Sequence, residues 1–552
     1  MSDLSSEHKP IRIHDTVHGY ITLPWEYAVR FVDTPQFQRL RRIEQSAVRS
    51  LFPTARHDRF THSLGVYHVG CLIEEHFKEE WKAEYLKDFR GVYDSLFDKY
   101  PEIVESYKIA CLLHDVGHAP FSHTLEDFFG GNDINKRRLM LEEALKEETQ
   151  KSESEQFWSD YDATRINSKS IPKPHEFSSA IVCVKCYGDS IKRTNNASID
   201  YVVRMILGVK FNESSDERDQ LANIFIELLH GETIDADRLD YACRDTWASG
   251  YCTSSVDMRR LIYAMHIRNT ENGIVLCYND KVVNEIESLL NVKDFQVKYI
   301  FNHHVVVYDQ YLLQMAAKTM SRHFFPHPFY DKEGKILSSE EQQNKAMACF
   351  INIDALIASG NNYCPQSSHA EYKVRLNGGA INIAHIADED ILFLMKQTDN
   401  PYYEEWASRQ YKYYPLWKTR DEFHTLFPES IGKTEAPNIN KVKQTILSAL
   451  QTDDSNSIII LPATFRGRTV LTNLKLWSNG KVIDYSELNP KEGPIPYPRL
   501  RREYQPQKET IFYVYYRNSF MKEQQVEREK ERKELLGKLE GPLNAFYKNE
   551  LH

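Results

Sequence analysis

A histidine and an aspartate stand side by side at the end of an apolar stretch in the segment ESYKIACLLHDVGH. The residues from Ile109 to Leu113 predict a mostly buried helix, and Gly117 marks its end. His114 and Asp115 would then lie where an imidazole and a carboxylate are costly to bury without compensation. A divalent metal ion would compensate both, and such ligands suit Mn, Fe, Zn or Mg.

Two other segments could supply further ligands. In RFTHSLGVYHV, His62 lies at a predicted helix start beside Arg59. The segment IDADRLDYACRD concentrates four carboxylates within eleven residues: Asp235, Asp237, Asp240 and Asp245. A lone His-Asp pair is a weak signal in a chain with 21 histidines, so the prediction of a metal site depends on these two segments.

The order of these motifs resembles a known family. RFxHSLG, LLHDxGHxPFSH, a His-Glu pair and IDxDxxDYxxRD follow one another as in the HD superfamily. They are most similar to the deoxynucleoside triphosphate triphosphohydrolases (dNTPases and dGTPases) related to SAM-and-HD-domain proteins. The openings HDTVHGYITL and DTPQFQRLRRIEQ are also similar to that subfamily. The resemblance covers roughly residues 10 to 325, and the C-terminal third matches only loosely.

The resemblance implies which residues bind the metal and which catalyse. The implied metal ligands are His62, His114, Asp115 and Asp237, whereas Asp235 would be structural. The implied catalytic residues are His118, His123, His175 and Glu126, a glutamate where the family more often has aspartate. Because histidine titrates near neutrality, any of the three could protonate a leaving oxygen.

Substrate contacts are implied in the same way. Arg59 and Arg238 match positions that hold the triphosphate, the second being lysine more often in the family. Four residues match positions around the sugar, where a tyrosine over the ribose 2′ carbon would exclude ribonucleotides: Gln45, Tyr241, Asp245 and Tyr308. Gln310 and Tyr311 depart from the pattern, since a His-Lys pair commonly stands there.

A third set of residues concerns regulation. Asp33, Gln38 and Arg41 match residues that hold a regulatory guanine nucleotide at subunit contacts in the family. This match implies activation by a nucleotide and a homo-oligomer, either a dimer or a tetramer. The alternative is that RLRR is merely a basic helix face.

Three functions follow as hypotheses of different classes. The leading one is metal-dependent hydrolysis of a deoxynucleoside triphosphate to deoxynucleoside and tripolyphosphate. The second keeps the metal site but acts as a phosphodiesterase on a cyclic or signalling nucleotide or on single-stranded nucleic-acid ends, which the missing His-Lys pair would favour. The third is a protein that binds nucleotides at a degraded site, against which the complete ligand set argues.

The chain is long enough for two or three structural units. We expect a mainly α fold, with an HD-domain helical core over residues 1–330 that carries a charged, exposed helical insertion at about 130–174. Residues 331–552 should form an α+β region for regulation or oligomerisation, with a small antiparallel sheet. Its strands are predicted at SIIILPATF, TVLTNLKLW, KVIDYSEL and IFYVYYR, with a hairpin turn at Asn479-Gly480 and a charged terminal helix.

Composition excludes several classes of protein. The net charge of −10 argues against a general nucleic-acid surface, although it leaves nucleic acid open as a partner. No segment is apolar enough to span a membrane, and MSDLSSEHKP lacks a signal-peptide core. Nine cysteines, an odd number scattered along the chain, fit reduced thiols. We therefore expect a cytoplasmic protein.

Overall fold

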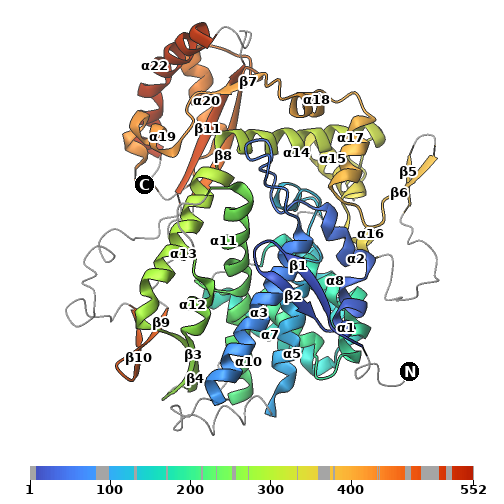
Figure 1. Cartoon of the computed structure of the whole chain (residues 1–552). Helices are drawn as coiled ribbons and strands as arrows, with labels where there is room; N and C mark the ends of the chain where they lie inside the picture. The colour runs from blue at the N-terminus through green and yellow to red at the C-terminus, as the bar shows by residue number, and fades with distance from the viewer. Residues whose placement is uncertain are drawn as a thin grey trace.

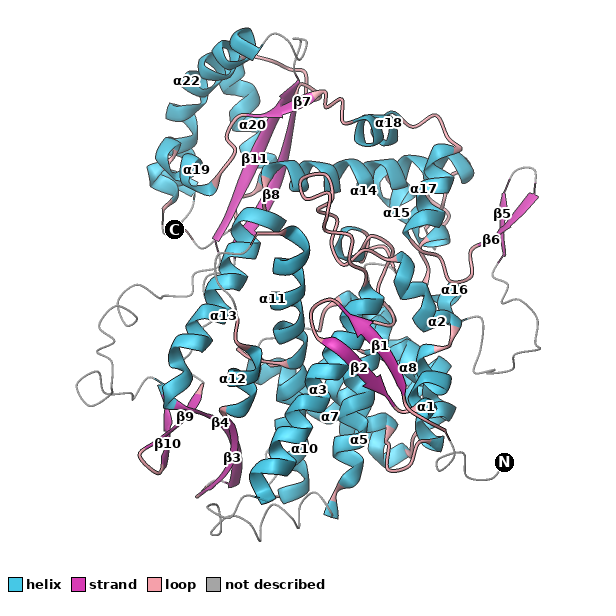
Figure 2. Ribbon diagram, in the orientation of Figure 1, coloured by secondary structure: helices cyan, strands magenta, loops and turns pink. Residues whose placement is uncertain are grey.

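The structure is a computed structural model in which helices predominate (Figure 2). The described residues are 8–82, 99–129, 134–168, 172–212, 216–231, 233–251, 256–271, 273–331, 333–357, 373–376, 379–431, 433, 436–465, 474–485, 509–517 and 525–550. The prediction of a mainly α fold is confirmed. In this part of the chain, no helix is both long and apolar enough to cross a membrane.

The N-terminal half is a bundle of helices preceded by a hairpin. Strands β1 (Ile11–Asp15) and β2 (Gly19–Leu23) pair antiparallel. The short elements that follow are α1 (Trp25–Tyr27), η1 (Ala28–Val32), α2 (Pro35–Gln38) and η2 (Arg39–Arg42). The bundle consists of α3 (Arg59–Lys82), α5 (Pro101–Leu113), α8 (Pro174–Arg193), α9 (Ile199–Leu207), α10 (Glu217–Leu229) and α11 (Ala236–Ser249), with the short η4 (Ser122–Thr124) after α5. The apolar faces of these helices form one large core.

The charged segment at about 130–174 is helical, as expected, but it is not simply an exposed insertion. It forms α6 (Ile134–Glu148) and α7 (Lys151–Ser168), which pack against α8 and α9. Leu141, Leu145 and Phe157 are at most 1% exposed and belong to the main core. The prediction of exposure was wrong for this face, because the charges that dominate the composition lie on the opposite face of each helix.

The second half of the chain alternates helices with short strands. Its first elements are α12 (Met258–Tyr263), β3 (Met265–Thr270), β4 (Gly273–Asn279), η5 (Asp280–Val282), α13 (Val283–Gln296), η6 (Val297–Phe301) and α14 (His304–Phe324). Then come α15 (Ser339–Phe350), α16 (Ile353–Ile357), β5 (Lys373–Leu376), β6 (Gly379–Asn382), α17 (Asp388–Lys396) and α18 (Pro401–Ser408). The last are β7 (Tyr413–Pro415), α19 (Arg420–Leu426), η7 (Pro428–Ser430), α20 (Ile439–Leu450), β8 (Ile458–Phe465), β9 (Lys475–Ser478), β10 (Lys481–Asp484), β11 (Glu509–Arg517) and α22 (Gln525–Glu550).

The predicted C-terminal strands are present, but they belong to two sheets. SIIILPATF and IFYVYYR form β8 and β11, which pair antiparallel in a sheet of order β7-β11-β8. The hairpin β9–β10 turns at Asn479 and Gly480, whose φ angles of 48° and 77° suit a tight hairpin turn. This hairpin joins β4 and β3 in a sheet of order β10-β9-β4-β3, where β9 runs parallel to β4. The first residues of TVLTNLKLW lie outside the described part of the chain.

Two large hydrophobic cores and a small third cluster organise the described residues, and neither large core follows a single boundary near residue 330. The larger core includes the helical bundle together with Met347, Phe350 and Leu476. The smaller one joins β8, β11 and α22 with Tyr308 and Leu312. Helix α14 contributes to both cores and lies between the bundle and the C-terminal sheet (Figure 1).

Candidate metal centre and histidine cluster

Three helix ends place the candidate metal ligands. His62 lies in the first turn of α3, and His114 is the C-cap of α5, with Asp115 next in the chain. Asp235 is the N-cap of α11, where its Oδ1 accepts a hydrogen bond of 2.6 Å from the Arg238 backbone N–H. That cap begins a helix whose first turn carries Asp237.

The four predicted ligands converge. The Nε2 atoms of His62 and His114 lie 3.3 Å apart. Asp237 Oδ1 is 3.0 Å from the first and 3.8 Å from the second. Asp115 Oδ2 is 3.6 Å from each of them. The side chain of Asp237 is 38% exposed whereas those of His62 and Asp115 are nearly inaccessible, so the cluster opens to solvent on the Asp237 side.

This donor set fits a divalent cation. Burial lowers the pKa of His62, but hydrogen bonds to Asp237 and Asp240 outweigh burial and raise that pKa to about 10. Burial likewise raises the pKa of Asp237, yet its bond to His62 leaves the pKa well below the usual range. The cluster thus attracts positive charge at a point where two imidazole nitrogens and two carboxylates meet. Imidazole nitrogens and carboxylate oxygens are the ligands that Mn, Fe, Zn and Mg sites share.

A buried network behind the ligands orients His62. The Nδ1–H of His62 donates to Asp240 Oδ2 at 2.7 Å, which leaves Nε2 directed at the cluster. Asp240 in turn accepts from His18 Nε2 at 2.6 Å and from Arg244 Nε at 2.9 Å. Arg244 also donates to Asp15 Oδ2 at 2.8 Å. No role was predicted for His18, Arg244 or Asp15. Asp240 could have been predicted to lie near the ligands, because it follows Asp237 by one helical turn.

The predicted catalytic residues form a second cluster beside the first. Glu126 Oε2 accepts from His175 Nδ1 at 2.8 Å and from His123 Nδ1 at 3.0 Å. The ring of His118 stacks on that of His175 with centroids 4.6 Å apart. Burial raises the pKa of Glu126, but the two histidine hydrogen bonds outweigh it and leave the pKa well below normal. The pair of histidines therefore shares one ionised carboxylate.

His118 differs from the other two histidines. It is fully buried, and neither of its ring nitrogens has a hydrogen-bond partner among the described residues. Burial lowers its pKa well below the usual value, and the nearby Arg59 lowers it further. A neutral imidazole with two unpaired nitrogens is costly in a folded protein, which suggests that a ligand completes its hydrogen bonding.

The loop after α5 that carries His118 and leads to His123 is strained, and residues distant in the sequence hold it in place. Phe121 and Ser122 have φ angles of 55° and 51°, which is rare for residues other than glycine. Asp388, at the start of α17, accepts the Phe121 backbone N–H at 2.6 Å. Arg39 donates to the His118 carbonyl oxygen at 2.8 Å. Asp388 was missed because it lies far away in the sequence and belongs to no motif, whereas Arg39 lies within DTPQFQRLRRIEQ but received no role there.

The two arginines expected to bind phosphate lie near the clusters, and both already donate hydrogen bonds to other protein groups. Arg59 donates to Asp115 Oδ2 at 2.6 Å, to Ser122 Oγ at 3.0 Å and to the Gln45 carbonyl at 3.0 Å. Its guanidinium therefore links the metal ligands to the histidine loop. Arg238 donates to the Tyr241 hydroxyl at 3.3 Å.

The residues expected around the sugar separate into two places. Gln45 lies beside Arg59, and Asp245 accepts from His57 Nε2 at 2.6 Å at the C-terminal half of α11. Tyr308 belongs to the smaller core, where its hydroxyl donates to Glu405 Oε1 at 2.6 Å. Tyr311, one of the two departures from the family pattern, packs in the same core.

The three expected regulatory residues lie together near the surface. Gln38 donates to the Val32 carbonyl at 3.0 Å and accepts from Arg41 Nε at 2.8 Å. Asp33 follows Val32 directly and is exposed. Arg41 also stacks its guanidinium on Phe60 at 3.5 Å.

Comparisons with known proteins bear on the family. The HD domain family model matches residues 59–167. The human deoxynucleoside triphosphate triphosphohydrolase SAMHD1 is 28% identical over 309 residues, which is 53% of this chain and 42% of the relative. The SAMHD1 homolog of Dictyostelium discoideum is 37% identical over 139 residues, which is 24% of each chain. A putative HD domain-containing protein of Acanthamoeba polyphaga mimivirus is 27% identical over 55% of both chains.

The chain spans about half the length of the curated relatives it matches. A crystal structure of a hypothetical protein from Aquifex aeolicus covers 96% of the chain at 18% identity, with a TM-score of 0.49. The matched region contains His62, His114 and Asp115. The chain therefore carries an HD domain with groups that could bind a metal, and it resembles the HD-domain deoxynucleoside triphosphate triphosphohydrolases.

Proposed function

We propose that the protein hydrolyses deoxynucleoside triphosphates to deoxynucleoside and tripolyphosphate in a metal-dependent reaction. One observation carries the proposal: the convergence of His62, His114, Asp115 and Asp237 beside histidines that share the Glu126 carboxylate. This arrangement offers a metal site and a proton source at one position. The similarity to relatives that bear this activity in their names supports the choice of substrate.

The roles divide between the two clusters. The four ligands would hold a divalent ion, which supplies charge neutralisation at phosphate and a lowered pKa of bound water. Arg59, between Asp115 and Ser122, brings a permanent positive charge to the same place for the triphosphate. Arg238 would bind phosphate beside Tyr241. Water adds to the α-phosphorus, and the 5′ oxygen leaves with the electrons of the broken bond.

That leaving oxygen needs a proton, and the geometry favours the Glu126-linked histidines over His118. Burial lowers the pKa of His118, and neither of its ring nitrogens meets a carboxylate among the described residues, so we assign it hydrogen bonding rather than proton donation. His123 and His175 each bind the ionised Glu126 through Nδ1, which directs Nε2 away from the carboxylate. A carboxylate on one nitrogen stabilises the imidazolium that gives up the proton from the other.

Substrate selection would rest on residues around the sugar. We assign this role to Gln45, which lies beside Arg59, and to Tyr241 and Asp245 on α11. Tyr308 could close over a ribose only after its hydroxyl leaves Glu405, because that hydrogen bond now fixes the ring in the smaller core. We include all four in the proposal.

Activation by a second nucleotide is a separate part of the proposal. Asp33, Gln38 and Arg41 form one connected surface group, with Arg41 hydrogen bonded to Gln38. If they hold a regulatory nucleotide between copies of this chain, Arg41→Ala should abolish both stimulation and nucleotide-dependent assembly. Analytical ultracentrifugation with and without GTP measures the assembly. Unchanged stimulation and assembly would refute activation by a second nucleotide and leave the proposed hydrolysis unaffected.

The activity itself is tested by incubating the purified protein with each deoxynucleotide and either Mn or Mg, then separating the products. We expect deoxynucleoside and tripolyphosphate, lost in His114→Ala. The matched control is His323→Ala, because His323 is an exposed histidine near the end of α14. Cleavage of a cyclic dinucleotide or an oligonucleotide, with every triphosphate intact, would identify a phosphodiesterase instead. Nucleotide binding without turnover would leave a sensor.

A further inference from the structure

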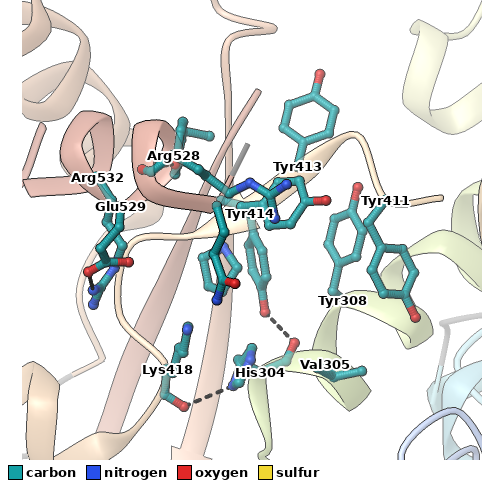
Figure 3. Close-up of a pocket in the computed structure, with 14 residues that line it drawn as sticks. His304, Val305, Tyr308, Tyr411, Tyr413, Tyr414, Lys418, Arg528, Glu529 and Arg532 are labelled. Atoms are coloured by element: carbon teal, nitrogen blue, oxygen red, sulfur yellow. Dashed lines mark hydrogen bonds and ion pairs between the residues drawn. The ribbon is translucent and has the colours of Figure 1, made fainter. Parts of the chain in front are cut away.

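A cavity of about 280 Å³ lies between the N-terminus of α14, the strands β7 and β11, and the start of α22 (Figure 3). Its lining contains none of the metal ligands and none of the three clustered histidines. Its lining includes aromatic, imidazole and cationic side chains: Tyr308, Tyr414, Tyr515, His304, Lys418 and Arg528. Tyr308 is the one residue of this lining that the proposed hydrolase reaction uses, and the other lining residues have no role in it.

The walls of the cavity are aromatic. Six tyrosines contribute to its lining: Tyr308, Tyr411, Tyr413, Tyr414, Tyr515 and Tyr516. Five of them have hydroxyls bound to other protein groups: Tyr308 to Glu405, Tyr411 to Asp309, Tyr413 to the Asn456 carbonyl and Tyr515 to the His304 carbonyl, at 2.6–2.7 Å, and Tyr516 to the Arg528 carbonyl at 3.4 Å. Because their polar ends are satisfied by protein groups, these side chains offer ring surfaces to an occupant. Ring surfaces suit a planar aromatic group, which stacks favourably on them.

The charges around the cavity are mainly positive. Lys418, Arg528 and Arg532 line it, against the single acid Glu529. Arg532 donates to Glu529 at 2.8 Å, so these two neutralise each other. The guanidinium of Arg528 lies 4.2 Å from the centre of the Tyr414 ring, where a cation and an aromatic wall meet in one place. Arg532 also pairs with Glu422. Lys418 and Arg528 therefore supply the cationic side chains of this lining that could approach an anion.

His304 adds one directional contact. Its Nδ1–H donates to the Lys418 carbonyl at 3.0 Å (Figure 3), which leaves Nε2 as an acceptor. Burial lowers the pKa of His304 to about 3, so the ring stays neutral at physiological pH. A neutral acceptor can receive an N–H from a heterocyclic base.

We propose that this cavity binds a planar aromatic anion of the size of a nucleoside monophosphate. The base would stack among the tyrosines, and the phosphate would meet Arg528 and Lys418 at the rim. The volume lies at the low end of the range for ligand sites, about 300 Å³, which suits one base with its sugar phosphate. The site shares only Tyr308 with the proposed substrate contacts and contains none of the candidate metal ligands.

The test measures binding by isothermal titration calorimetry with the full chain carrying His114→Ala, which disables the candidate metal centre. The probes are AMP, GMP and UMP, with adenosine and inorganic phosphate for comparison. We expect a saturable 1:1 site for at least one nucleotide, bound about tenfold or more tightly than adenosine or phosphate. Arg528→Gln and Lys418→Gln should each weaken it about tenfold, as for a hydrogen bond to a charged group.

A steric variant and a matched control complete the experiment. Val305→Trp fills the cavity without altering its charge and should abolish binding. Lys533→Gln removes an exposed charge from α22 outside the lining and should leave binding unchanged. Thermal melts by circular dichroism verify that each variant is folded. The proposal is overturned if no nucleotide saturates below about 1 mM, or if binding survives Arg528→Gln, Lys418→Gln and Val305→Trp in folded protein.

Discussion

Replacing Glu126 by glutamine tests the histidine cluster most directly. Glu126 Oε2 accepts from two histidines, at 2.8 Å from His175 and 3.0 Å from His123. Glutamine keeps the shape and one acceptor oxygen but removes the negative charge. An adjacent opposite charge shifts a histidine pKa by about 1–3 units. Since the His123 side chain is 55% exposed, solvent screening places the expected decrease in the His123 pKa in the lower half of that range, at about 1–2 units.

The effect on turnover follows from the protonated fraction. Burial already lowers the pKa of His123, and Glu126 counteracts this. Without the carboxylate, the pKa of His123 falls. At a pH above that pKa, each unit of decrease lowers the fraction of protein with a protonated His123 about tenfold. We therefore expect kcat near pH 7.5 to fall about 10- to 100-fold, within the usual contribution of general acid catalysis. The decline of kcat with rising pH should move about 1–2 units toward acid.

Two measurements and a control decide the matter. The rate of product formation, measured from about pH 5 to 9, gives the dependence of kcat on pH. Histidine NMR titration reports the pKa of His123 without requiring activity. Glu142→Gln is the matched control, because Glu142 pairs with Lys146 on the surface of α6, far from the reaction. The reasoning fails if the kcat profile of Glu126→Gln superimposes on the parent profile. It also fails if the His123 pKa stays constant.

Three further substitutions test the supporting structure. Asp240→Asn weakens the bond that orients His62 and should lower Mn affinity about 10- to 100-fold by calorimetry; equal affinity would contradict that role. Gly65→Ala should cost about 1–3 kcal/mol or more in chemical unfolding, because its Cβ would lie 1.9 Å from Asp240 Oδ1, whereas Gly537→Ala, with open space around it, should not destabilise. Burial raises the pKa of Asp388 to about 7, so the folded state retains a proton that the unfolded state loses above about pH 4. The free energy of unfolding should therefore fall by up to about 4 kcal/mol from pH 4 to 7, and Asp388→Asn should flatten that slope.

The candidate metal ligands were assigned from the resemblance of their motifs to a known family, and the structure brings these residues close together at helix ends. His114 ends an apolar helix, and Asp237 follows an N-cap aspartate by two residues. What could not be predicted is how the loop after His114 is held. Asp388 and Phe121 are 267 residues apart in the chain, and no periodicity or capping pattern links positions with that separation.

The fold was predictable in its elements and less so in its packing. Strand patterns and the Asn479-Gly480 turn identified β8, β10 and β11 because alternation and turn chemistry are local. Which sheet a strand joins depends on contacts with distant segments, and so the pairing of β9 with β4 had no signature. For the same reason, the apolar face of α6 and α7 was hidden among charges that dominate their composition.

The parallel pairing of β9 with β4 also affects how the chain is made. Tyr278 pairs with Leu476, so about 200 residues must be synthesised before the edge of β4 is covered. At roughly 5–20 residues per second, that edge emerges about 10–40 s ahead of its partner. Until then β3 and β4 form a two-stranded hairpin with an open edge, which is a template for pairing with another nascent chain. The half of this protein that carries the candidate metal centre therefore emerges from the ribosome well before the sheet can close.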